Sequence, residues 1–294
     1  MRLDLWLWAA GGVLVLIAGV LRLSLRAKAD PAFLAGWGLL APLVLACGGL
    51  ASLVAGLAWR IAAGVLPLWR PDVWPGSTSA DGVVMLAVGT LAILSWLLLT
   101  DLRRIKAANS RDLGVAESGV DSGRAIAEAL ALFGSCLLVL LAVGAAWRNP
   151  LPESSPYARS WLFAARVITA SLGLGAWLPA FADAVWGLRL GLERSGPEPP
   201  DVALGPEAMR IGYPWLTAAW LLGAAWSLAA VAALWRGVST DAWLAVAWLL
   251  GGIYLIAGRA DRPSLLPRWA LVLLTACGMA AALLQAWQTP LLLF

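Results

Sequence analysis

The chain has 294 residues, of which 61% are hydrophobic and 13% charged. Soluble domains are roughly 45–50% apolar and about 25% charged, so the composition excludes a soluble globular domain and a disordered chain. There is no histidine, which excludes a Ser-His-Asp triad, a His-ligated zinc or a bis-His haem built by this chain alone. The net charge of +4 is typical of basic loops between membrane spans and gives no reason to expect nucleic acid as a partner.

Eight apolar runs have about the length that an α-helix needs to cross roughly 30 Å of hydrocarbon, although the seventh is short by these boundaries. In chain order, we expect transmembrane helices over Leu5–Leu21, Phe33–Ala58, Gly82–Thr100, Ala125–Trp147, Trp161–Leu188, Pro214–Trp235, Ala242–Ala257 and Trp269–Trp287. No internal repeat divides them. The sequence therefore predicts an all-α membrane protein, with residues 1–294 forming a single bundle of eight transmembrane helices.

Lysines and arginines are shared unevenly between the two sides of this predicted bundle. Fourteen of the 21 fall in the first, third, fifth and seventh connections, and six fall on the other side. Because cytoplasmic loops carry the excess of basic residues, the odd-numbered connections are predicted to be cytoplasmic and both termini to be outside. The expected location is a bacterial inner membrane crossed several times, with the lipid bilayer as the first partner.

Three ionisable side chains lie in the predicted spans, where an exposed charge costs a few kcal/mol. Arg166 and Asp183 are 17 residues apart, about 25 Å along one helix, so they are too far apart to pair with each other. For each we favour a structural ion pair or snorkelling, and contact with an anionic group is the alternative for Arg166. Glu128 lies in the first turn of its predicted span, where the helix dipole favours a carboxylate.

The cysteines, methionines and titratable residues give little indication of a metal site or a catalytic site. Cys47, Cys136 and Cys277 each lie in an apolar run without paired spacing, so we interpret them as buried small hydrophobic residues. Met85 and Met279 also lie in spans, where methionine is usually a packing residue. Few titratable groups lie where a pocket would form. The sequence therefore names no catalytic residue and no metal ligand, and it favours a non-enzymatic role while leaving enzymatic activity open.

Tryptophan is crowded in the last third of the chain, where six of the 19 lie between Trp215 and Trp248. The fixed spacing of Gly223, Trp226, Trp235, Trp243, Trp248, Tyr254 and Leu255 matches a helix–loop–helix signature, and Gly212, Pro214, Leu216 and Thr217 match the G-x-P-x-L-T that precedes it. This pattern resembles the cytochrome c assembly protein family, the CcsA-, ResC- and CcmC-type haem handlers. The resemblance implies an eight-helix core with a tryptophan-rich loop on the outer side.

Two weaker matches extend the resemblance toward the N-terminus. Residues Arg60–Leu68 resemble the family's R-x-x-x-G-h-x-P-L. Ser160-Trp161-Leu162, followed by Val167 and Leu172-Gly173, resembles its S-x-W-L-x-x-H-V…L-G. The resemblance therefore covers a core of about residues 60–287, in order along the chain.

The departures from the family fall on its haem-binding positions. Where the family has histidines, this chain has Ala165 or Arg166, then Ile256 and Trp287. Alanine and isoleucine have no lone pair, and tryptophan offers only an N–H donor. The cofactor is therefore unknown, and haem would need ligands from a partner or from residues other than histidine. The resemblance implies a shelf for a flat cofactor at Trp226, Trp235, Trp243 and Trp248, with Arg166 as a possible contact for an anionic group.

Two functions follow from these observations. The chain is either a divergent haem-handling or haem-delivery component of c-type cytochrome biogenesis, or a non-catalytic subunit of a larger electron-transfer or photosynthetic complex that reuses the scaffold. Helices rich in Ala, Gly and Ser allow close helix–helix approach within or between chains, so we expect other membrane subunits as partners. A transporter is less favoured, because no paired Gly- or Pro-interrupted spans occur.

Overall fold

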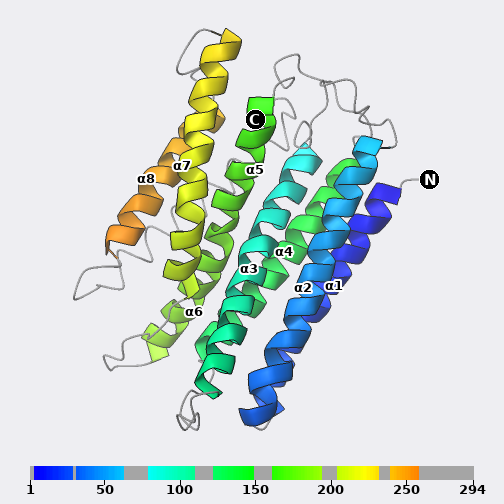
Figure 1. Ribbon diagram of the computed structural model, residues 1–294, viewed down its shortest axis with the longest axis vertical. Coiled ribbons are helices and arrows are strands. Elements are labelled where there is room, and N and C mark those ends of the chain that lie inside the picture. The colour runs from blue at the N-terminus through cyan, green and yellow to red at the C-terminus, as the bar shows by residue number, and fades with distance from the viewer. Residues whose placement is uncertain are drawn as a thin grey trace.

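A computed structural model describes residues 3–28, 31–62, 79–109, 122–148, 161–193, 204–231 and 239–257. In these ranges the chain is α-helical, with one turn residue and no strand. The helices are α1 (Leu3–Lys28), α2 (Pro31–Ala62), α3 (Ser79–Asn109), α4 (Ser122–Arg148), α5 (Trp161–Gly175), α6 (Trp177–Glu193), α7 (Leu204–Val231) and α8 (Ser239–Ala257) (Figure 1). For this part of the chain the all-α prediction is confirmed.

Five segments are long and apolar enough to cross a membrane, namely Leu3–Ser24, Leu39–Arg60, Gly82–Arg104, Arg124–Gly144 and Trp161–Trp186. The protein is therefore a multi-pass integral membrane protein. The predicted sixth span, Pro214–Trp235, lies in α7 as far as Val231, but α7 is not among these five segments. The predicted seventh span falls in α8, whose apolar part Leu244–Ile256 is shorter. The predicted eighth span, Trp269–Trp287, lies outside the described residues, so a total of eight spans stays a prediction.

The helices run alternately up and down, except that α6 continues the direction of α5, and the bundle therefore has two distinct ends (Figure 1). At one end, α1, α3 and α6 finish and α4 and α7 begin; we call it the Glu128 end. At the other end α1 begins and α2 and α4 finish; we call it the Asp4 end. The helix α3 lies at the centre, because 78% of its apolar span is buried, against 39% for α2. It packs on α2, α4 and α5, and α7 packs on α5 and carries α8.

Exposed tryptophans at helix ends gather at the Asp4 end. They are Trp6, Trp59, Trp147 and Trp161, on α1, α2, α4 and α5. Tryptophan is enriched where a membrane meets water, so this ring agrees with an aromatic belt at one membrane surface.

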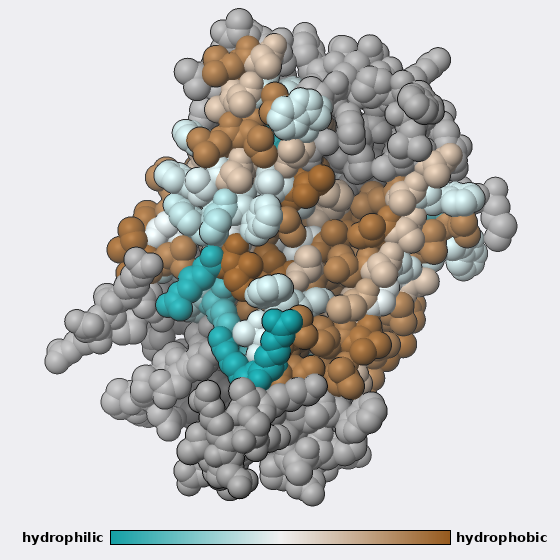
Figure 2. Space-filling view, viewed as in Figure 1, coloured by the Kyte–Doolittle hydropathy of each residue, from teal (hydrophilic) through white to brown (hydrophobic). Residues whose placement is uncertain are grey.

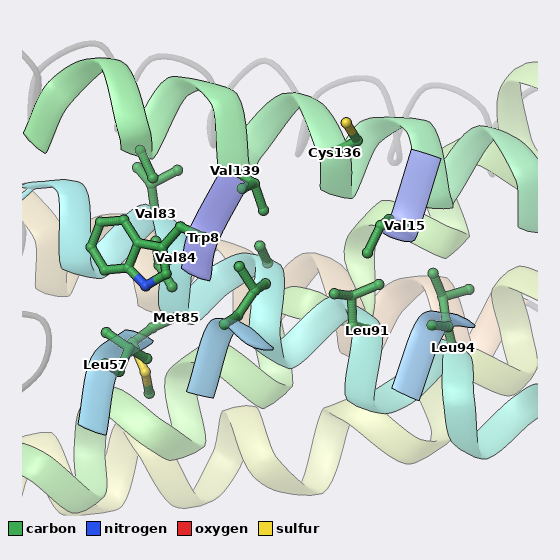
Figure 3. Packing of buried hydrophobic residues seen from close by; sticks show 14 of the residues in the cluster. Trp8, Val15, Leu57, Val83, Val84, Met85, Leu91, Leu94, Cys136 and Val139 are labelled. Carbon is green, nitrogen blue, oxygen red and sulfur yellow. The ribbon is translucent and has the colours of Figure 1, made fainter. Parts of the chain in front are cut away.

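The largest cluster of buried residues lies mainly between α1, α2, α3 and α4, and it reaches α5 and α7 at Phe163 and Trp226. Trp8 is fully buried there, and the close-up shows it beside Val83, Val84 and Leu57 (Figure 3). Cys136 is buried in the same cluster, as expected, but Cys47 is exposed on α2. The interpretation of Cys47 as buried was wrong because lipid is as apolar as a protein core, so an apolar run does not show which face is inside.

The predicted continuous helix over Trp161–Leu188 is broken into α5 and α6 at Ala176. Pro179 explains the break, because it has no N–H to donate to Gly175 and its ring clashes with that carbonyl. The chain makes a tighter turn instead, in which the Ala176 N–H donates to the Gly173 carbonyl at 3.3 Å.

The break lies where α3 and α5 touch backbone to backbone. A Cβ on Gly89 would collide with the carbonyl group of Ser171, and a Cβ on Gly175 would come within 2.5 Å of the backbone of Gly89 and Thr90. Only glycine leaves room for this approach, which resembles the small-residue contacts that bring membrane helices together.

Candidate functional site

The candidate site is a buried cluster between α5 and α7, which we call the Arg166 cluster: Phe163, Arg166, Gly223 and Trp226. Arg166 is only 4% exposed, and its guanidinium carbon lies 5.8 Å from the centroid of the Trp226 ring. The rings of Phe163 and Trp226 are tilted at 52°, with centroids 5.5 Å apart. A Cβ on Gly223 would lie 3.1 Å from Arg166 Nε, so this glycine makes room for the guanidinium.

The environment of Arg166 suits a cation that is removed from water. A guanidinium over the face of a tryptophan gains roughly 2 kcal/mol or more when both groups are desolvated. This placement agrees with a structural role for Arg166 inside the bundle. Contact between Arg166 and an anionic group stays a prediction.

Glycines also allow close contact between α5 and α7 on the side of the Arg166 cluster that faces the break at Ala176. A Cβ on Gly173 would lie 2.7 Å from the backbone nitrogen of Leu216, and a Cβ on Gly212 would collide with Ala176. Close approach of the two helices therefore extends from the Arg166 cluster to the break at Ala176.

Trp248 of α8 lies in a second aromatic group, on another face of α7. Its ring stacks between Tyr213 and Trp220, with centroid distances of 6.0 and 5.9 Å, and its Nε1 donates to Thr217 Oγ1 at 2.9 Å. The spacing of these three α7 residues places them on one helix face, whereas Trp226 points toward α5.

The structure therefore does not bring Trp226 and Trp248 together into one shelf. Each ring already has aromatic partners from this chain. Trp235 lies outside the described residues, and for Trp243 only the backbone, in α8, is described. The part of the proposed shelf that involves these two residues stays a prediction.

Asp183 has a structural role at the start of α7. Its Oδ2 accepts a hydrogen bond from the backbone N–H of Gly205 at 2.9 Å. The first N–H groups of a helix have no hydrogen-bond acceptor inside the helix. The Asp183 carboxylate of α6 provides that acceptor for the first turn of α7. Asp183 and Arg166 lie on different helices, α6 and α5, because the break at Ala176 separates them.

Glu128 is the centre of an ion-pair network at the Glu128 end. Its side chain is 0% exposed, and its Oε2 accepts a hydrogen bond from Arg22 Nε at 2.6 Å. Arg124, one turn earlier on α4, donates to the other carboxylate oxygen at 3.3 Å. Because α4 begins at Ser122, Glu128 lies in its second turn and not in its first, so paired arginines stabilise it instead of the helix dipole.

The network continues from Arg124 to α3 and α7. Arg124 pairs with Asp101 at 2.8 Å and with Glu207 at 3.0 Å, and Arg104 pairs with Glu207 at 2.9 Å. Three arginines and three carboxylates thus join α1, α3, α4 and α7 without net charge. Sequence reasoning singled out Glu128 alone, although the i,i+4 spacing of Arg124 and Glu128 was a signal for a pair.

A second buried ion pair lies at the Asp4 end. Arg60 Nη1 donates to Asp4 Oδ2 at 3.1 Å, and the Arg60 guanidinium carbon is 5.3 Å from the Trp8 ring centroid. Arg60 belongs to one of the stretches that resemble the assembly family. Its ion pair with Asp4 joins the end of α2 to the start of α1.

The described residues do not fit the ligation of haem iron. Methionine, cysteine and tyrosine can also be axial ligands. Met85 and Cys136 belong to the largest apolar cluster, Met209 and Tyr254 belong to a second one, and Tyr213 stacks on Trp248. Within the described ranges no group of three or more Cys, Asp and Glu side chains is arranged to hold a metal ion.

Comparisons with known proteins add no relative. No protein-family model, no curated protein and no solved structure matches the chain.

Replacing Arg166 by lysine is expected to destabilise the protein by about 1 kcal/mol, because a compact, strongly hydrated ammonium interacts less well with the buried Trp226 ring than a guanidinium does. The measurement is the folded fraction that remains after heating in detergent, followed by size-exclusion chromatography. Arg103→Lys is the control, since Arg103 is exposed and surface changes are usually within about 0.5 kcal/mol. Equal behaviour of the two variants would contradict a stabilising contact between Arg166 and Trp226.

Proposed function

We propose that this chain is a divergent membrane protein of the cytochrome c assembly type, located in a bacterial inner membrane. It keeps the family scaffold, and the iron of any haem that it handles is ligated by a partner. The odd-numbered connections are cytoplasmic, so the Glu128 end is the cytoplasmic end and the Asp4 end is the outer one.

The observation that carries this proposal is the meeting of separate resembling stretches at one interface. Gly173 of α5 contacts Leu216 of α7, and Arg166, at or next to a family histidine position, contacts Gly223 and Trp226. These residues come from stretches about 40 to 60 positions apart in the chain. We expect such contact between these stretches if both belong to one family core.

In the proposed role, the residues of this chain hold the helices next to the haem-handling loop in place. The Arg166 cluster and the glycine contacts hold α5 against α7, and α7 and α8 flank residues 232–238. That segment contains Trp235 of the resembling loop and is placed by the proposed orientation at the outer surface. A haem-holding partner would dock there, and no step at the iron is assigned to this chain.

A second candidate is a structural subunit of a larger electron-transfer or photosynthetic complex. The observation that favours it is the pairing of the intramembrane charges within the chain. Glu128 pairs with Arg22, Arg124 with Asp101, and Asp4 with Arg60. Because these charged groups pair with each other and join helices, they fit a structural role better than a catalytic one.

A haem titration distinguishes the two candidates and tests the missing ligation. The protein is purified in mild detergent, alone and as the complex isolated from its membrane, and haem is measured by the pyridine haemochrome assay. We expect no saturable haem on the chain alone and close to one haem per chain in the complex. Stoichiometric haem on the chain alone contradicts partner ligation, and no haem in either sample contradicts the assembly role. Haem in a complex made of respiratory or photosynthetic subunits favours the structural subunit.

A further inference from the structure

The central helix α3 is exposed along one narrow stripe. Val88, Ala92, Trp96, Leu99 and Arg103 are spaced by four, four, three and four residues, which places them on one face of the helix. Trp96 is 55% exposed and Arg103 is exposed, while the other three are half-buried. The rest of the apolar part of α3 is largely covered by neighbouring helices.

The depth of this stripe matches one leaflet of a bilayer. Trp96 lies seven residues before Arg103, about 10 Å along the axis, and Ala92 lies eleven residues before it, about 16 Å. Half of a hydrocarbon core of about 30 Å is about 15 Å. Trp96 thus lies at the depth of acyl chains, unlike the exposed tryptophans at the helix ends of the Asp4 end.

Two exposed arginines lie beside the ion-pair network at the Glu128 end. Arg103 and Arg210 are exposed, and among the described residues neither has a carboxylate partner. They flank the contact between Arg104 and Glu207, since Arg103 adjoins Arg104 on α3 and Arg210 follows Glu207 by one turn on α7. Figure 2 shows hydrophilic side chains gathered near the lower ends of these helices, below a mostly apolar surface.

We propose that the α3 stripe, with Arg103 and Arg210, binds an anionic phospholipid of the adjoining leaflet. The lipid phosphate lies at the two arginines, and one acyl chain lies along Leu99, Trp96 and Ala92. Two observations select a lipid over a partner helix. Trp96 is the one exposed large hydrophobic side chain among the described residues of α3, whereas a packed helix needs a broad apolar face. The positive charge of Arg103 and Arg210, unpaired within the described ranges, favours an anion at headgroup depth.

The test measures lipid binding to the full-length protein in neutral detergent by native mass spectrometry. Phosphatidylglycerol and phosphatidylcholine of equal chain length are the probes. We expect one phosphatidylglycerol to bind at least tenfold more tightly than phosphatidylcholine. Replacing both Arg103 and Arg210 by alanine should weaken phosphatidylglycerol roughly thirtyfold, since each basic residue near a membrane surface contributes about 1 kcal/mol.

Two further variants keep the proposal open to contradiction. Arg148→Ala removes an arginine at the Asp4 end of α4 and should leave phosphatidylglycerol binding within about twofold. Trp96→Ala removes the ring from the stripe and should weaken both lipids severalfold. Equal binding of the two lipids to the wild-type protein, unchanged binding by the double arginine variant, or an equal loss in Arg148→Ala overturns the headgroup site. Unchanged binding by Trp96→Ala overturns the acyl-chain contact.

Discussion

Replacing Glu128 by alanine is expected to destabilise the folded protein by about 3–5 kcal/mol. The carboxylate is fully buried and accepts from Arg22 and Arg124, whose side chains are 4% and 7% exposed. Removing it leaves buried guanidinium groups without their shared acceptor, which is far more costly than removing both partners together. The measurement is the midpoint of thermal unfolding in detergent, compared with the wild-type protein.

The double variant Arg22→Met with Glu128→Met is the matched control. It removes both charges and fills the space with apolar side chains, so it should recover most of the stability lost in Glu128→Ala. If the double variant is as unstable as Glu128→Ala, packing and not charge pairing holds this end together. If Glu128→Ala melts like the wild-type protein, the network is not present in solution.

Among the glycines that the structure describes, Gly89 is the one where replacement by alanine is expected to be most disruptive. The new Cβ would collide with backbone atoms of Ser171, which cannot rotate away as a side chain can. The helices α3 and α5 would have to separate, and overpacking of this kind costs roughly 1–3 kcal/mol, or more where backbone is involved. The measurement is again the thermal midpoint in detergent.

Gly144→Ala is the matched control for this substitution. Gly144 lies in the interior of α4, and a Cβ there would meet nothing within 4 Å. Because alanine favours a helix over glycine by up to about 1 kcal/mol, Gly144→Ala should leave the midpoint unchanged or raise it. Two variants that shift the midpoint in the same direction would show that helix propensity, and not the contact with Ser171, governs both positions.

Composition and hydropathy were sufficient to predict the class of the molecule and most of its helices. The predicted span Ala125–Trp147 falls within α4, and Gly82–Thr100 falls within α3. The break at Ala176 was missed because Pro179 lies in an uninterrupted apolar run, and proline is tolerated in membrane helices. The exposure of Cys47 was missed because the lipid-facing and core-facing sides of a span have similar composition.

The candidate site was only partly predictable. Arg166 was singled out because a charge in a span needs a special environment, but its ring partner Trp226 lies 60 residues away. With 19 tryptophans in the chain, sequence alone could not select that ring. The ion-pair network joins Arg22 to Glu128 across 106 positions, and pairing over such distances depends on how helices pack, which local patterns do not record.

The proposed role is tested most directly by isolating the tagged protein from its own membrane at native expression and identifying every co-purifying protein by mass spectrometry. A role in cytochrome c assembly predicts a haem-binding membrane partner or an apocytochrome c in near-stoichiometric amount. A fixed set of respiratory or photosynthetic subunits, with no assembly protein among them, would contradict that role and identify the chain as a structural subunit.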